Sequence, residues 1–151
     1  MGNMNIEIER KFLLKSDQFK EEAHKKNRMK QGYLSKDPGR TVRIRITENQ
    51  GLITIKGPSS ADGKERLEWE KSIPLHDAMA LMELCLPEPL DKTRYWIDVQ
   101  GFIFEVDEFH GKHQGLVVAE IELQSANQNF PKPSWLGEEV TGNPAYYNSQ
   151  M

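Results

Sequence analysis

Hydrophobic and polar residues alternate along most of this chain, with apolar side chains at every second position over short stretches. Alternation with a period of two is typical of β-strands that present one face to a core. The pattern predicts eight strands, over residues 6–14, 30–34, 40–47, 52–56, 66–73, 92–99, 102–108 and 117–123. Turn residues at 49–51 and 100–101 join neighbouring stretches as hairpins, so we expect the strands to pair antiparallel.

Two stretches with helical spacing interrupt the strands. Ser16 or Asp17 can cap a helix that runs to about residue 26, and Asp77 can cap a second helix that runs toward Pro87. The tail from residue 133 onward predicts a short helical segment with aromatic anchors. The sequence has no repeat and no linker-like tract, so these elements predict one α+β domain over residues 1–151.

The polar face of the strands carries pairs of like charges at positions i and i+2, which place both side chains on one side of a strand. These pairs are Glu7/Glu9, Arg43/Arg45, Glu68/Glu70, Lys92/Arg94, Glu105/Asp107 and Glu120/Glu122, and Lys11 and Lys56 extend the set. An ordinary sheet with one solvated face is the alternative interpretation, but such faces avoid adjacent like charges, which are destabilising. Dense charge of both signs is tolerable where a sheet encloses water, ions and a charged ligand. We therefore expect an eight-stranded antiparallel β-barrel with a polar, charged lumen and helices packed on the outside.

The two signs of charge predict two kinds of ligand. Carboxylates without neighbouring His or Cys ligands favour a hard divalent cation, Mg²⁺ or Mn²⁺ rather than Zn²⁺. Clustered Arg and Lys favour phosphate, and about six such cations suit an oligophosphate better than a monophosphate. A divalent ion between carboxylates and phosphate oxygens is the apparatus of phosphoryl transfer.

Composition narrows the partners and the compartment. The net charge of −3 excludes binding to nucleic acid through overall positive charge, and no nucleic-acid partner is expected. No membrane partner is expected either, because no apolar run is long enough to span a bilayer and the first residues do not resemble a signal peptide. Cys85 is the single cysteine and cannot form an intrachain disulfide, so the cytoplasm is the expected location.

Glu7-Ile8-Glu9-Arg10-Lys11 resembles the ExExK signature of the CYTH superfamily, the triphosphate tunnel metalloenzymes. The resemblance covers almost the whole chain, because further motifs follow in the order that this family uses. They are Gln31-Gly32-Tyr33-Leu34, Val42-Arg43-Ile44-Arg45, Thr54-Ile55-Lys56, Glu68-Trp69-Glu70, Lys92-Thr93-Arg94-Tyr95, Glu105-Val106-Asp107-Glu108-Phe109 and Ala119-Glu120-Ile121-Glu122. The resemblance implies an eight-stranded antiparallel tunnel that holds a linear triphosphate.

The resemblance also implies a division of roles among the charged residues. The metal ligands would be Glu7, Glu9, Glu120 and Glu122, while Asp107, Glu68 and Glu70 would bind a second ion or hold the basic residues in place. The phosphate ligands would be Arg43, Arg45, Lys56, Lys92 and Arg94. Lys11 is expected to handle the attacking water and Tyr33 to orient it, with an aromatic side chain at the tunnel mouth as an equal alternative for Tyr33.

The function implied by the resemblance is metal-dependent hydrolysis of inorganic tripolyphosphate to pyrophosphate and phosphate. The chain lacks aromatic insertions that would grip a base or a thiazole, which favours this substrate over a nucleoside triphosphate or thiamine triphosphate. A non-catalytic polyphosphate-binding or nucleotide-binding module is a further alternative, although a pure binder has little need for its own metal ligands. The sequence leaves open whether the protein is a monomer or a homodimer. It also leaves open whether one tunnel mouth is closed, since no further helix follows Tyr146-Tyr147-Asn148.

Overall fold

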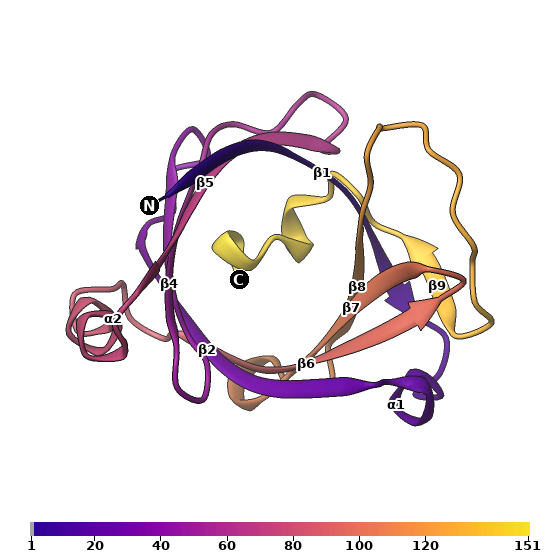
Figure 1. Ribbon diagram of the computed structural model, residues 1–151, viewed down its shortest axis with the longest axis horizontal. Helices are drawn as coiled ribbons and strands as arrows, with labels where there is room; N and C mark the ends of the chain where they lie inside the picture. Colours follow the sequence, from indigo (N-terminus) through magenta and orange to yellow (C-terminus); the bar gives the residue numbers. More distant parts are fainter. Residues whose placement is uncertain (1) are drawn as a thin grey trace.

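Eight antiparallel strands form a closed ring in the computed structural model, which describes residues 2–151 (Figure 1). The strands are β1 (Asn3–Leu14), β2 (Lys25–Ser35), β3 (Thr41–Ile46), β4 (Gly51–Lys56), β5 (Glu65–Ile73), β6 (Leu90–Val99), β7 (Phe102–Phe109) and β8 (Val117–Glu122). They follow the order β5-β4-β3-β2-β6-β7-β8-β1, and a pairing between β5 and β1 closes the ring. The predicted eight-stranded antiparallel barrel is therefore confirmed.

Strand β1 closes the barrel because it pairs with a different neighbour along each half. Its first half pairs with β5, with Ile6 opposite Leu67, and its second half pairs with β8, with Glu9 opposite Glu122. A short ninth strand, β9 (Leu136–Glu139), adds to the end of β1. Gly137 sits close to the backbone of Leu13, where a side chain would meet the Leu13 carbonyl oxygen.

The apolar faces of the strands point outward and are covered on two sides. Phe104 and Ile121 pack with Phe19 of α1 (Phe19–Glu22) and with Trp135, which precedes β9. On the other side, Ile44 packs against α2 (Leu75–Met82). The two helices thus lie outside the ring, as predicted (Figure 1).

The bounds of both helices differ from the prediction. Helix α1 ends at Glu22 rather than near residue 26, because the chain from Lys25 onward pairs with β6 and extends β2 by several residues. Tertiary hydrogen bonding here overrides the weak helical preference of a Lys-rich stretch. Helix α2 begins directly after Pro74, so Asp77 lies inside its first turn instead of capping it.

The short helical segment predicted in the tail from residue 133 is confirmed only near the end of the chain, as 3₁₀ turns. Residues 136–139 form β9, which finds hydrogen-bond partners on β1. The chain then enters the ring, where Pro144–Tyr146 and Asn148–Gln150 form two single 3₁₀ turns (Figure 1, yellow). Among residues 2–151, no helix is long and apolar enough to cross a membrane.

Candidate active site

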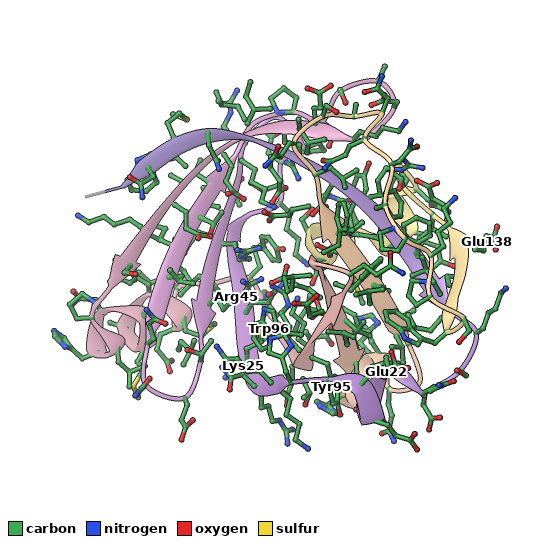
Figure 2. The ribbon with its side chains drawn as sticks, turned by 45° about the vertical axis from the view of Figure 1, so that its right-hand side comes forward. Glu22, Lys25, Arg45, Tyr95, Trp96 and Glu138 are labelled. Carbon is green, nitrogen blue, oxygen red and sulfur yellow. The ribbon has the colours of Figure 1, made fainter. Side chains whose placement is uncertain are left out.

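The interior of the barrel is lined by charged side chains, as the i, i+2 pattern predicted. Directly opposed residues of antiparallel strands share a face, and the register sets Lys11 opposite Glu120, Arg94 opposite Asp107 and Lys56 opposite Glu68. Figure 2 shows Arg45 within the ring, whereas Glu138 of β9 points away from it. A cavity in this lumen is bounded by Glu9, Lys11, Tyr33, Thr41, Arg43, Arg45, Thr54, Lys56, Ser59, Gly63, Arg66, Lys92, Arg94, Glu120, Tyr147, Asn148 and Ser149.

One side of the lumen, on β3 and β6, carries more positive charge than its neighbours neutralise. The buried Arg45 side chain has one hydrogen-bond acceptor among the described residues, the neutral Gln31 Oε1, at 3.1 Å from Nε and 3.0 Å from Nη2. Burial, with the nearby Arg43 and Arg94, lowers the pKa of Arg45 to about 9. Within residues 2–151, the Nε of Arg43 is buried without a hydrogen-bond partner. This side can therefore receive an anion that supplies the missing negative charge and acceptors.

Asp107 holds two of the cations in place. Its carboxylate accepts from Lys92 Nζ at 2.7 Å, from Arg94 Nε at 2.7 Å and from Arg94 Nη2 at 2.9 Å. Burial alone would raise the pKa of Asp107, but Arg94 and Lys92 outweigh it and hold the pKa well below its usual range. Of the two roles predicted for Asp107, these contacts favour holding the basic residues over binding a metal.

Glu68 and Glu70 likewise contact cations on neighbouring strands. Glu70 accepts from Thr54 Oγ1 at 2.7 Å and lies 3.5 Å from Arg43 Nη2, and Glu68 lies 3.5 Å from Lys56 Nζ. The same ammonium donates to Glu7 at 2.8 Å. The basic residues are therefore oriented by carboxylates that lie beside them on the same sheet.

The opposite side of the lumen, on β7, β8 and β1, gathers carboxylates. Glu120 lies opposite both Lys11 and Glu105 in the register, and Glu9 lies opposite Glu122. Burial, with the repulsion of Glu120 and Glu7, raises the pKa of Glu9 well above its usual value. Negative charge is in excess here, and a bound cation would reduce the repulsion between these carboxylates.

This donor set suits a hard divalent ion, because it consists of carboxylate oxygens crowded together without sulfur or imidazole. Among residues 2–151, no three Asp, Glu, His or Cys side chains are grouped as they would be around a metal ion. Lysines pair with the carboxylates instead, with Lys56 on Glu7 and Lys11 on Glu120 at 3.5 Å. The ligand set Glu7, Glu9, Glu120 and Glu122 stays a prediction.

Lys11 lies on β1, on the carboxylate side of the lumen, and lines the cavity. Its ammonium is 3.5 Å from Glu120 and donates to the main-chain oxygen of Tyr146 at 3.0 Å. Burial opposes its charge, but Glu120 and Glu9 outweigh burial and raise the pKa of Lys11. Lys11 is therefore a charged hydrogen-bond donor at neutral pH. Tyr33 is buried and lines the same cavity.

Several residues of the cavity were missed by the sequence reasoning. Arg66 and Thr41 could have been found, since each lies two positions from a predicted lumen residue, Glu68 and Arg43. Gln31, which contacts Arg45 but does not line the cavity, carries no charge and so did not enter the charged pattern. Tyr147, Asn148 and Ser149 follow no strand periodicity, and no sequence signal placed them in the tunnel.

The sequence of this chain is similar to those of known proteins. The family model of the CYTH domain matches residues 5–148. An inorganic triphosphatase of Acetivibrio thermocellus is 44% identical over 149 residues, which cover 98% of this chain and 94% of the relative. An inorganic triphosphatase of Nitrosomonas europaea is 33% identical over 148 residues, which cover 96% of this chain and 95% of the relative.

Solved structures share the fold. A crystal structure described as an inorganic triphosphatase superposes with a TM-score of 0.65 at 31% identity, covering 95% of this chain and 94% of its own. A protein from Pyrococcus furiosus has a TM-score of 0.61 at 21% identity, covering 79% of each chain, and shows the fold alone.

Proposed function

This chain belongs to the CYTH domain family, and from that membership and the charged tunnel we propose that it hydrolyses inorganic tripolyphosphate to pyrophosphate and phosphate. Its two relatives at 44% and 33% identity are named inorganic triphosphatases and match nearly end to end. Water is the nucleophile in this proposal. Hydrolysis takes place inside the barrel.

The observation that carries this proposal is the division of the lumen into a cationic and an anionic side. Arg45 is a buried guanidinium whose acceptor is a neutral amide, and Arg43 has a free buried N–H among the described residues. Charge-assisted hydrogen bonds from several such groups favour an extended polyanion over a single phosphate.

The basic residues bind and orient the phosphate chain in this scheme. Three strands carry these residues, with Arg43 and Arg45 on β3, Lys56 on β4, and Lys92 and Arg94 on β6. Asp107, Glu68 and Glu70 hold four of these side chains before the substrate enters, and Gln31 holds Arg45. Such preorganised charge is the main contribution that a protein makes to phosphoryl transfer.

The carboxylate side would hold Mg²⁺ or Mn²⁺ through Glu7, Glu9, Glu120 and Glu122. A divalent ion bound there supplies Lewis-acid stabilisation of the charge on phosphate oxygens. The charged Lys11 donates hydrogen bonds to the water or to the phosphate that the water attacks, and its raised pKa argues against a role as general base. Tyr33 orients the same water from the cavity wall.

Steady-state phosphate release tests this proposal. The kcat/KM for tripolyphosphate should exceed the values for ATP and thiamine triphosphate by about tenfold or more, with either Mg²⁺ or Mn²⁺. A higher kcat/KM for an organic triphosphate would replace the proposed substrate. Binding of tripolyphosphate without turnover would instead indicate a binding module.

A further inference from the structure

We propose that Asn148 is a positioning residue for the phosphate-binding cations, acting on Lys92 directly and on Arg45 through Gln31. The proposal rests on the function proposed above and adds a residue from outside the strands. Asn148 lies on the second 3₁₀ turn of the segment that enters the ring. Its side chain contacts Lys92 on β6 and Gln31 on β2.

A single oxygen of Asn148 connects these groups. Its Oδ1 accepts from Gln31 Nε2 at 2.8 Å and from Lys92 Nζ at 2.9 Å. Gln31 is fully buried, and its own Oε1 accepts from Arg45 Nε and Nη2. Asn148, Gln31 and Arg45 therefore form one chain of hydrogen bonds.

The direction of this chain matters because a glutamine amide has a donor end and an acceptor end. Asn148 Oδ1 accepts a hydrogen bond from Gln31 Nε2, which leaves Gln31 Oε1 facing Arg45. Without Asn148, the buried amide nitrogen of Gln31 loses its acceptor, and the amide can turn so that its NH₂ group meets the guanidinium. Arg45 would then lose the acceptor that orients it, since Gln31 provides its hydrogen bonds among the described residues.

Lys92 is fixed by the same oxygen from a second direction. An ammonium has three donors, and those of Lys92 reach Asp107 at 2.7 Å and Asn148 at 2.9 Å. Two fixed donors set the direction of the third. That third N–H is the one left to bind a phosphate oxygen.

Neighbouring residues hold Asn148 in the tunnel independently of its side chain. Lys11 donates to the carbonyl of Tyr146, Gln150 Nε2 donates to the carbonyl of Lys36 at 3.3 Å, and Ser149 is buried. The segment therefore has several attachments. Removing the Asn148 amide removes the links to Lys92 and Gln31 while the other attachments remain.

The test is a double-mutant cycle of Asn148→Ala and Gln31→Ala, with Gln150→Ala as the matched control. Each variant is measured for KM and kcat with Mg²⁺, for the calorimetric Kd of tripolyphosphate without added metal, and for Tm. We expect Asn148→Ala to raise KM and Kd about tenfold with kcat changed less than about threefold, because uniform binding is lost. Gln150→Ala, on the same turn but without a contact to a lumen cation, should keep both within about twofold of the wild type.

Coupling in the cycle separates positioning from a purely structural role. The Kd of the double variant for tripolyphosphate should be no more than about twofold higher than that of the single variant with the higher Kd. Both changes interrupt the same chain of hydrogen bonds, so their effects do not multiply. Effects on Kd that multiply, an unchanged Kd in Asn148→Ala, or an equal loss in Gln150→Ala would each overturn the proposal. Gln31→Ala in an Arg45→Ala background tests the same chain from the barrel side, and a further loss of about tenfold there would also overturn it.

The Kd measurements need no turnover, so they separate this proposal from the proposed function. A wild type that does not hydrolyse tripolyphosphate overturns the function alone. A wild type that does, beside an unaffected Asn148→Ala, overturns the role of Asn148 alone.

Discussion

Lys92 Nζ lies 2.7 Å from Asp107 Oδ2 in the interior of the barrel, and both side chains are almost completely buried. A buried ion pair often contributes little net stability, because both charges lose their hydration. This pair also has Arg94 on the same carboxylate, which leaves two cations on one anion. The excess positive charge of Lys92 and Arg94 is available to a further anion that binds beside them.

The Asp107 carboxylate should make stability depend on pH. Its pKa is depressed in the folded protein, so its contribution is present above its unfolded pKa of about 3.9 and is lost as the pH falls through the folded value. Asp107→Asn should therefore lower Tm near neutral pH, and the difference from the wild type should shrink below about pH 4. Thermal melts without added metal, from pH 3 to 7, check this. A difference in Tm that stays constant with pH would contradict it.

Glu120→Gln should remove most activity at ordinary Mg²⁺ concentrations while the fold remains. A neutral amide keeps the shape of the side chain but binds a hard dication poorly. Tm should fall near neutral pH without loss of the fold, because Lys11 and Arg94 outweigh burial and lower the pKa of Glu120 to about 2, and a neutral amide loses that attraction. Activity and melting are measured beside Glu139→Gln, a matched change in an ion pair with Arg10 on the outer side of the barrel. Near wild-type kcat with unchanged metal dependence in Glu120→Gln would refute the metal assignment.

Arg45→Ala and Arg43→Ala should weaken tripolyphosphate much more than orthophosphate. Each lost charge-assisted contact is worth about 1.5–3 kcal/mol, and a longer anion makes more of them. Calorimetric titration with both anions measures the difference. Arg28→Ala, which removes an exposed pair with Asp91, is the control and should leave both affinities unchanged. Equal losses for the two anions in the lumen variants would argue against an extended binding track.

Lys11→Ala should lower kcat about 100-fold with a smaller change in KM, because the ammonium acts in the transition state more than in binding. The raised pKa of Lys11 means that it donates rather than accepts a proton at neutral pH. Any alkaline-rising limb in the pH–rate profile should therefore persist in Lys11→Ala. Its disappearance would identify Lys11 as the general base and overturn this assignment.

The barrel and its charged lumen could be predicted because the signal lies in local pattern. A pair such as Arg43 and Arg45 puts two like charges on one strand face, and such pairs are tolerable only inside a polar enclosure. The extension of β2 to Lys25 could not be predicted in this way, since it depends on pairing with Trp96 and its neighbours on β6.

The role proposed for Asn148 could not be predicted from the sequence pattern for a different reason. Its position depends on where the chain turns after β9, and its contacts join residues separated by 117 positions in the case of Gln31. Neutral residues that act through hydrogen bonds leave no mark in charge or periodicity. Only the folded chain brings Asn148 to Lys92.

The most direct test of the account is a ³¹P NMR time course of tripolyphosphate hydrolysis by the wild-type protein with Mg²⁺ or Mn²⁺. The tripolyphosphate signals should decay while pyrophosphate and phosphate appear in equal amounts, and pyrophosphate should then persist. Tripolyphosphate signals that stay unchanged with both metals, while calorimetry shows binding, would contradict it.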